Sequence, residues 1–313
     1  MKTPLRYPGG KSRAVKHILP LIPEDCGELC SPFLGGGSVE LAVAERGTRV
    51  HAYDLFEPVV WFWQALLSDP ARLAALADEH RVGHVDYGEK RGLLKEDFHR
   101  LRTELRKNYT FSFENAAKFY AINRSSFSGA TFSGGWSKRA SYARFTDSSI
   151  DRIKSFNEPS LSVECADFKD SIAKHPDAFL YLDPPYLLGE DKDRLYGDNG
   201  STHAGFDHKA LYEILSKRTG WVLSYNSCEE IRELYKDYQI IDAKWAYGMK
   251  NVTPPAVIAE KKFLEQLIGI LEEVPVGVIE NQELYINFID SLRNRSKELK
   301  KAMGSSSEIL ITG

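Results

Sequence analysis

Short apolar stretches recur along the chain, and segments with helical periodicity separate them. The apolar stretches are rich in β-branched and aromatic residues, which is typical of strands buried on both faces of a sheet. They predict strands at 27–31, 48–53, 161–165, 178–182, 221–225, 238–246 and 308–312. Apolar positions at helical spacing predict helices at 14–19, 38–45 and 56–67. This alternation predicts an α/β fold with a doubly wound sheet.

Two insertions interrupt the alternation. Residues 70–157 contain a predicted charged amphipathic helix at 89–108 and a segment rich in Gly, Ser and aromatic residues at 123–145, so we interpret them as an inserted, mostly helical domain. Residues 255–303 show two helical apolar repeats separated by Pro275 and Gly277, which predict a helical hairpin. We therefore expect the sheet domain to comprise 1–69 and 158–313, with 70–157 as a second domain.

The composition is that of an ordinary soluble protein of 313 residues. Apolar runs are too short to span a bilayer and the N-terminus lacks a signal-peptide core, so we expect a cytoplasmic protein without a membrane partner. The four cysteines show no C-x-x-C spacing and no nearby histidine pair, so they predict neither a zinc site nor a disulfide framework. The net charge of −3 argues mildly against a nucleic-acid partner, unless basic residues gather on one face.

The predicted strand at 178–182 ends in the sequence Asp183-Pro184-Pro185-Tyr186. Because the two prolines must end the strand, a carboxylate and an aromatic ring follow its carboxyl end, where open α/β sheets bind ligands. Asp183 and the Pro184 carbonyl can accept the two hydrogens of an exocyclic amine, while Tyr186 can stack on the base that carries it. A strand followed by a plain Pro-Pro loop would show the same sequence, so the tetrapeptide alone leaves both interpretations open.

A glycine-rich turn lies between the first predicted strand and its helix. Gly35-Gly36-Gly37 lets the backbone approach a ligand closely, and Asp54 ends the next strand about 20 residues on, as a ribose-binding carboxylate does in Rossmann-type sites. Glu40 stands where the third glycine of G-x-G-x-x-G would be, so the fingerprint is incomplete. The turn suits a nucleoside without a phosphate chain, such as S-adenosylmethionine, although a tight turn without a ligand is the alternative.

Two further segments are candidates for cofactor contacts. In the second glycine turn, residues 6–11, Lys11 would face the methionine carboxylate and Tyr7 the cofactor. Asp167 and Phe168 follow the predicted strand at 161–165, where a carboxylate could accept from an adenine amine and a ring could cover its face. The alternative for residues 6–11 is a flexible chain start that caps the fold. The alternative for Asp167 and Phe168 is an ordinary, solvated helix start.

The order of these elements resembles one known family. Pro-Gly-Gly-Lys, Pro32-Phe-Leu-Gly-Gly-Gly-Ser38, an inserted basic domain and Asp-Pro-Pro-Tyr follow one another as in the Dam-type (D12 class, α-group) DNA adenine-N6 methyltransferases. The resemblance covers nearly the whole chain apart from about 255–303. Tyr7-Pro8 stands where the family commonly has Trp-Ala.

The resemblance implies a Rossmann-like S-adenosylmethionine-dependent methyltransferase sheet, with 70–157 as its target-recognition domain. Asp183, Pro184 and Tyr186 would hold a flipped adenine, and a methyl group would pass to its N6 by direct in-line displacement without a metal. The implied S-adenosylmethionine site consists of Tyr7, Lys11, Phe33, Gly35, Asp54, Asp167, Phe168 and Asp183.

The segment 124–146 holds basic and aromatic residues and lacks acidic ones. Basic residues of this kind can neutralise phosphates, and arginine can bind guanine through two hydrogen bonds. This segment looks like the DNA-reading hairpin of that family. An ordinary exposed loop is the alternative interpretation. The resulting DNA-binding candidates are Arg124, Ser126, Lys138, Arg139, Tyr142 and Arg144.

We therefore expect a monomeric, sequence-specific adenine methyltransferase that acts on double-stranded DNA, encoded by a prokaryote or a phage, with a cognate restriction or defence protein as a candidate partner. N4-cytosine methylation stays open, because the amine chemistry is the same. A non-catalytic or partner-dependent DNA-binding subunit of a modification or defence complex, and a Rossmann oxidoreductase, stay open as well. The basic end of the second hairpin helix, with Arg293 and Arg295, is either a solvated face or an added DNA or partner contact.

Overall fold

The computed structural model describes residues 1–83, 88, 90–187, 206–243, 260, 263–264, 266–268, 270–271, 282–302 and 308–313. The chain forms two compact units, Met1–Trp245 with Glu308–Gly313 and Ala246–Ser307. In the smaller unit, helix α13 spans Gln282–Ala302, and the described positions between 260 and 271 are also helical. The turn predicted around Pro275 and Gly277 lies outside the described residues. No helix in the described part of the chain is long and apolar enough to cross a membrane.

The larger unit contains a mostly parallel sheet, which confirms the predicted α/β class. Its strands are β1 Glu28–Ser31, β2 Arg49–Asp54, β5 Leu161–Cys165, β6 Phe179–Leu182, β7 Trp221–Asn226, β8 Gln239–Asp242 and β9 Glu308–Thr312. They are ordered β5-β2-β1-β6-β7-β9-β8. The first five pair in parallel, and β9 runs antiparallel to β7 and β8.

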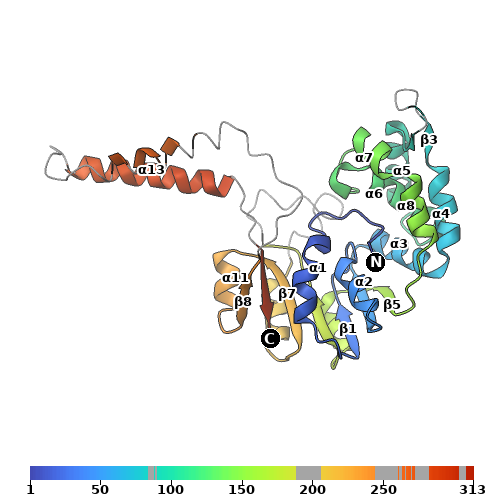
Figure 1. Ribbon diagram of the computed structural model, residues 1–313, viewed down its shortest axis with the longest axis horizontal. Coiled ribbons are helices and arrows are strands. Elements are labelled where there is room, and N and C mark those ends of the chain that lie inside the picture. The colour runs from blue at the N-terminus through green and yellow to red at the C-terminus, as the bar shows by residue number, and fades with distance from the viewer. Residues whose placement is uncertain are drawn as a thin grey trace. The chain divides into compact units, whose positions relative to one another are not determined.

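Hydrophobic side chains cover both faces of this sheet. In β6, Leu180 and Leu182 belong to one hydrophobic core while Tyr181 lies in the other. In β9, Leu310 lies in the same core as Tyr181, whereas the residues on either side of it lie in the opposite core. Because strand side chains alternate between faces, each strand contributes to both cores and its sequence is continuously apolar. The result is a three-layer, Rossmann-like arrangement (Figure 1).

Helices cover the two faces. One core includes residues of α1 Val15–Ile18, α2 Ser38–Ala44 and α3 Glu57–Ser68, and the other includes residues of α9 Phe168–Lys174, α10 His208–Leu215 and α11 Glu229–Leu234. The parallel strands all end at the same edge of the sheet, so the segments after β1, β2, β5 and β6 meet there. These segments contain the predicted site residues.

Helices dominate the insertion between β2 and β5. They are α4 Pro70–Glu79, α5 Lys95–Lys107, α6 Phe113–Ser125, α7 Lys138–Arg144 and α8 Asp147–Lys154, and a short ribbon pairs β3 Val82–Gly83 with β4 Arg91–Gly92. Helix α6 is buried along almost its whole length, which explains its Ala, Phe, Tyr and Ile content. Figure 1 shows these helices grouped beside the sheet, next to α3.

Two expectations for the insertion need correction. The helix predicted at 89–108 begins only at Lys95, because Arg91 and Gly92 pair with β3. The expected DNA-reading hairpin at 123–145 is not a pair of strands. An isolated antiparallel bridge, Ser126 to Trp136, closes a loop between α6 and α7, and the Ser137 side chain caps α7 by accepting from the Ala140 amide.

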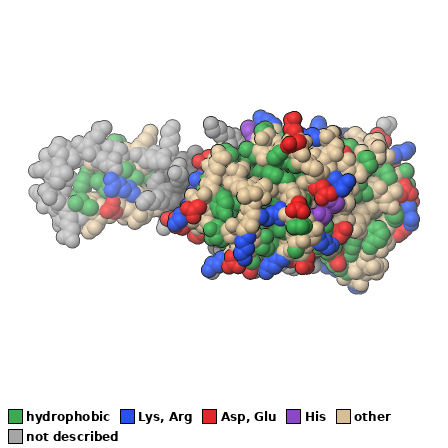
Figure 2. Space-filling model, turned by 90° about the horizontal axis from the view of Figure 1, so that it is seen from below, with side chains coloured by type: hydrophobic (Ala, Val, Ile, Leu, Met, Phe, Trp, Pro, Cys, Tyr) green, Lys and Arg blue, Asp and Glu red, His purple; other side chains and the backbone are tan. Residues whose placement is uncertain are grey.

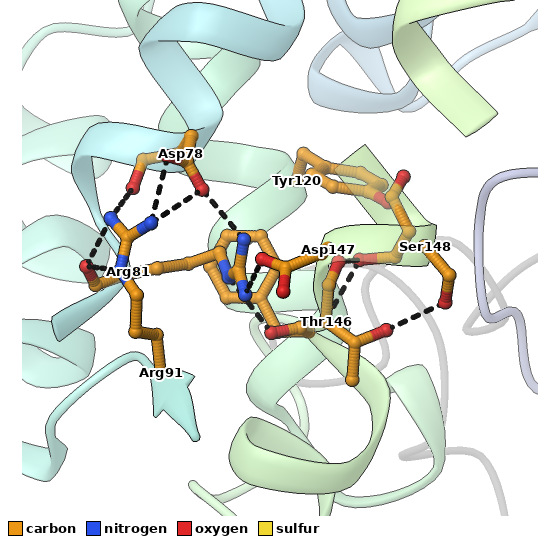
Figure 3. A network of polar contacts seen from close by, with 9 residues as sticks. Asp78, Arg81, Arg91, Tyr120, Thr146, Asp147 and Ser148 are labelled. Carbon is orange, nitrogen blue, oxygen red and sulfur yellow. Dashed lines mark hydrogen bonds and ion pairs between the residues drawn. The ribbon is translucent and has the colours of Figure 1, made fainter. Parts of the chain in front are cut away.

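A buried arginine ties the insertion together (Figure 3). Arg81 contacts Asp78 and Asp147 at 2.6 Å each and donates to the carbonyl of Phe145 at 3.0 Å. Arg91 reaches Asp78 at 3.0 Å and the carbonyl of Arg81 at 2.9 Å (Figure 3). This network links the end of α4, the β3–β4 ribbon and the start of α8.

We expect Arg81→Met to lower the free energy of unfolding by about 2 kcal/mol, because hydrogen bonds to a buried charged group are lost. Urea denaturation with an unchanged m-value would measure this loss. Arg72→Met is the control, since the Arg72–Glu114 pair is exposed and should contribute less than about 1 kcal/mol. Equal midpoints for both variants would contradict the proposed role of Arg81.

Candidate active site

Asp183 lies directly after β6, at the edge where the parallel strands end. Its carboxylate accepts from the ammonium group of Lys11, whose Nζ lies 2.6 Å from both carboxylate oxygens. The Lys11 side chain is 5% exposed and also donates to the carbonyl of Gly9 at 3.1 Å. A buried cation therefore fixes the orientation of the Asp183 carboxylate.

Glu308 is a second carboxylate at this cation, and the sequence did not predict it. It opens β9, its side chain is 2% exposed, and it lies 3.1 Å from Lys11 Nζ. It also accepts from the hydroxyl of Ser224 at 2.8 Å and from the hydroxyl of Tyr186. The sequence feature that could have indicated Glu308 is an acidic residue at the start of an otherwise apolar strand. Antiparallel pairing of β9 with β7 brings this residue to the site.

Burial changes the acidity of this site. Burial raises the pKa of Asp183 to about 6, with Glu308 adding to the rise and Lys11 opposing it. Burial likewise raises the pKa of Glu40 to about 7, while its hydrogen bond from Ser31 at 2.6 Å lowers it. Perturbed carboxylates gathered at a strand edge are typical of functional sites.

Pro184 and Tyr186 take defined places beside Asp183. Pro184 is buried, and the Tyr186 ring stacks on Tyr225 with ring centroids 5.9 Å apart and an interplanar angle of 24°. Lys11 Nζ lies 5.1 Å from the centre of the Tyr186 ring. The tetrapeptide and Lys11 thus lie together, although the sequence had placed Lys11 against the methionine carboxylate of the cofactor and not against Asp183. The partners observed for Lys11 include the carboxylates of Asp183 and Glu308 and the carbonyl of Gly9, so its contact with a methionine carboxylate stays a prediction.

The glycine turn packs tightly against Tyr7. Gly35 has a positive φ of 46°, and a Cβ at this position would lie 2.8 Å from the Tyr7 ring. Asp54 accepts from the amides of Gly35 and Phe56 at 2.8 Å each, and burial raises its pKa to about 6. Asp54 therefore orders the turn through backbone contacts, and a ribose contact by it stays a prediction.

Three aromatic rings lie together beyond the ends of β1 and β5. Phe33 stacks on Phe168 at 5.9 Å between centroids, and Phe206 contacts both rings at 5.6 and 5.3 Å. Asp167 caps α9 by accepting from the Lys169 amide at 2.9 Å. Phe206 completes an aromatic cluster of which the sequence predicted Phe33 and Phe168, and its half-buried rings, Phe33 and Phe206, are an apolar surface on which a purine could pack.

The DNA-binding candidates divide into two groups by exposure. Lys138, Arg139 and Arg144 are exposed. Arg124, Ser126 and Tyr142 are buried, at 7%, 0% and 3% exposure. Arg124 donates to the carbonyls of Arg144 and Pro4, and Ser126 accepts from the Thr131 amide, so these side chains hold the loop in the structure.

The insertion is bonded to the N-terminal segment that carries Lys11. Asn123 accepts from the Arg6 amide at 2.9 Å and donates to the Arg6 carbonyl at 2.6 Å. Burial lowers the pKa of Arg6 to about 10, with further lowering by the charges of Arg124 and Arg144. Three guanidinium groups therefore create a positive potential between the insertion and the site. On the face that Figure 2 shows, by contrast, basic and acidic side chains are intermixed.

Comparison with known proteins agrees with this geometry. The D12 class N6 adenine-specific DNA methyltransferase family matches residues 7–249, from Tyr7 beside the glycine turn to beyond β8. The chain belongs to this family. Its members are DNA methyltransferases that act on adenine, so the Asp183 site is the candidate catalytic centre of a DNA methyltransferase.

Two curated methyltransferases are similar to this chain over most of its length. The Type II methyltransferase M1.LlaDCHI of Lactococcus lactis subsp. cremoris is 25% identical over 267 residues, covering 79% of this chain and 89% of its own. The Type II methyltransferase M.CviBI of Paramecium bursaria Chlorella virus NC1A is 22% identical over 260 residues, covering 80% and 92%.

Proposed function

We propose that this protein is a sequence-specific methyltransferase that transfers a methyl group from S-adenosylmethionine to N6 of a flipped adenine in double-stranded DNA, by direct in-line displacement. The observation that carries the proposal is the Asp183 carboxylate, fixed by buried Lys11 beside Pro184 and Tyr186 within a chain of the adenine-specific family. The relatives' Type II names support a role in restriction–modification, with a cognate nuclease as the candidate partner.

Asp183 and the Pro184 carbonyl are the acceptors for the adenine amine. The lone pair of that amine is delocalised into the ring, and two acceptors on its hydrogens favour a tetrahedral nitrogen. Lys11 and Glu308 hold the acceptor still before substrate arrives, which is the preorganisation that stabilises developing charge. Asp183 thereby acts as an acceptor for charge that develops on nitrogen.

The glycine turn and the aromatic cluster fit S-adenosylmethionine. The Tyr7 ring packs directly on Gly35, so this ring and the turn can form one wall of the proposed cofactor site. The half-buried Phe33 ring, with buried Phe168 stacked against it, offers a surface for the adenine of the cofactor. The bound cofactor supplies an activated methyl group on a cationic sulfur. The two carboxyl groups of Asp183 and Glu308 and the one ammonium group of Lys11 have a formal net charge of −1, which complements that cation.

Tyr186 is the proposed stacking surface for the flipped adenine. The Tyr186 ring stacks on Tyr225, and its hydroxyl donates to Glu308, so these two residues fix the position of the ring before a base stacks on it. Flipping costs a few kcal/mol, and stacking on one aromatic ring offsets about 1–3 kcal/mol of this.

We propose residues 70–157 as the target-recognition domain, with exposed Lys138, Arg139 and Arg144 as its DNA contacts. Phe127 is 67% exposed at the start of the 126–136 loop, beside the bridge that closes it, and is available to a base or groove. Arg124, Ser126 and Tyr142 act on DNA through the loop that they support. The Arg6 guanidinium donates to the carbonyl of Ser126 at 3.1 Å, so it lies between the N-terminal segment of the sheet domain and the loop of the proposed recognition domain. We place Arg6 where both domains would contact DNA.

We expect Lys138→Ala and Arg139→Ala each to weaken DNA binding for all sequences and to reduce the salt slope of log K by about 1, because each removes one phosphate contact. Fluorescence anisotropy at several salt concentrations measures both quantities. Lys217→Ala is the control, since this exposed lysine lies beyond α10, outside the proposed recognition domain. If both variants had the same salt slope of log K as the wild type, Lys138 and Arg139 would not be phosphate contacts, contrary to the proposal.

Methyl transfer from labelled S-adenosylmethionine to unmethylated plasmid DNA tests the proposed function. Nucleoside mass spectrometry should find N6-methyladenine with the wild type and none with Asp183→Ala. N4-methylcytosine would refute adenine specificity. A folded protein that binds DNA and S-adenosylmethionine but methylates no base would refute autonomous catalysis, and would favour a partner-dependent DNA-binding subunit.

A further inference from the structure

Two histidines and a glutamate meet on the sheet, away from the proposed catalytic centre. Glu28 opens β1, His51 lies in β2 and His175 follows α9, and one ligand atom from each lies within 4.8 Å of the others. The two imidazole rings stack with centroids 4.3 Å apart. Glu28 and His175 both lie near the amino ends of strands, whereas Asp183 follows a carboxyl end, so this cluster is at the opposite edge of the sheet.

Neighbouring hydroxyl groups hold both rings in place. The Tyr53 hydroxyl is 2.7 Å from His175 Nε2, and the Ser162 hydroxyl is 3.1 Å from His51 Nδ1. His51 thus uses Nδ1 for an orienting hydrogen bond and directs Nε2 toward Glu28, while His175 has one ring nitrogen bonded to Tyr53. Metal-binding histidines are typically oriented in this way, with the second nitrogen bonded to an outer partner.

His51 Nε2 is a buried nitrogen with no hydrogen-bond partner among the described residues. The nearest acid, Glu28, is 3.8 Å away, which is too long for a hydrogen bond. Buried polar atoms without partners are rare in native proteins, and a position that binds an ion is one of the established explanations.

We propose that Glu28, His51 and His175 bind one divalent zinc-like cation, with water as the fourth ligand. Nitrogen and carboxylate ligands suit Zn²⁺, whereas Mg²⁺ and Ca²⁺ favour oxygen ligands alone. Ligand atoms at about 2.1 Å from a tetrahedral ion are about 3.4 Å apart, and the lone pair of an imidazole nitrogen lies in the ring plane. The stacked rings of His51 and His175 would therefore have to rotate apart to close the site around an ion. Glu28 can keep its 2.6 Å ion pair with Arg49, because a carboxylate has about four acceptor positions.

The bound ion would join β1, β2 and the segment between α9 and β6. β2 ends at Asp54, and the segment between α9 and β6 is flanked by the helix that begins at Phe168 and the strand that precedes Asp183, so the site would stabilise the part of the sheet that carries the proposed centre. Sequence motifs did not indicate this cluster, since its ligands are widely separated along the chain and no cysteine is among them. The inference does not depend on the proposed methyl transfer.

Zinc binding by the full chain tests this inference. Protein freed of metal with a chelator, and then exchanged into chelator-free buffer, is titrated with ZnCl₂ by calorimetry, and its Tm is measured with and without zinc. We expect one zinc per chain and a rise in Tm that saturates with it. Each of Glu28→Gln, His51→Gln and His175→Gln should weaken binding by more than about 100-fold, and Tyr53→Phe by about 10–100-fold.

His99→Gln is the matched control, because His99 is exposed on α5, and its affinity should equal that of the wild type. Each rise in Tm is taken relative to the same variant without metal, so a destabilised variant still gives a valid comparison. The absorption of the Co²⁺ form distinguishes nitrogen and oxygen ligands from the free cysteines, since thiolates add an intense charge-transfer band. Lack of stoichiometric binding, full binding by His51→Gln, or a thiolate band would each overturn the proposal.

Discussion

Asp183→Asn is expected to lower the single-turnover rate of methyl transfer by about 10³-fold. Asparagine keeps the shape of the side chain but offers one acceptor in place of a charged carboxylate, and its NH₂ group opposes the ammonium group of Lys11. Loss of a preorganised electrostatic contact typically costs about 10²–10³-fold, and here the acceptor and the ordering of Lys11 are lost together.

Single-turnover rates with saturating DNA and S-adenosylmethionine measure this effect, and calorimetry verifies that the cofactor still binds. Asp170→Asn is the control, since Asp170 is an exposed acid on α9. A rate within tenfold of the wild type, from a variant that binds both substrates, would refute the role of Asp183.

The same carboxylate predicts a pH dependence for the wild type. The pKa of Asp183 is raised to about 6, so its ionised form dominates above pH 6 and is lost as the pH falls below it. If ionised Asp183 is the acceptor, the rate should fall about tenfold for each pH unit below 6.

Much of the fold could be predicted because burial on both faces makes each strand an unbroken apolar run. The strand predicted at 161–165 has the observed bounds, and the one at 178–182 begins one residue later. Helix α5 was predicted too long because Leu93 and Leu94 continue the apolar pattern, although Gly92 belongs to β4. The residue at which such a helix begins depends on the pairing of a neighbouring strand, and the periodicity of apolar residues carries no information about that pairing.

The sequence predicted the site only as far as local motifs reach. Lys11, Gly35 and Asp183 stand in motifs, and the structure brings them to one edge of the sheet. Glu308 has no motif, because its place depends on β9 returning to pair with β7. The basic run around Arg124 suggested that this side chain is exposed, but Arg124 belongs to a helix that is buried along most of its length, where a charged group must bond to backbone carbonyls.

Lys11 and Glu308 provide the second large effect, since they act on Asp183 in opposite directions. Lys11 lowers the pKa of Asp183 and Glu308 raises it. Lys11→Met should therefore move the acid limb of the rate profile to higher pH, whereas Glu308→Gln should move it to lower pH. Lys11→Met also frees the carboxylate to rotate, so we expect a loss of about 10²-fold at pH 7.5.

Glutamine at position 308 can still accept from Ser224 and Tyr186, so Glu308→Gln should retain more activity than Lys11→Met. Rates from pH 5 to 9 for both variants, with exposed Lys169→Met as the control, separate an electrostatic role from a structural one. Variants that are merely destabilised would lose activity without moving the limb. Shifts in the same direction would contradict the arrangement, because one buried cation between two carboxylates requires the shifts to be opposite.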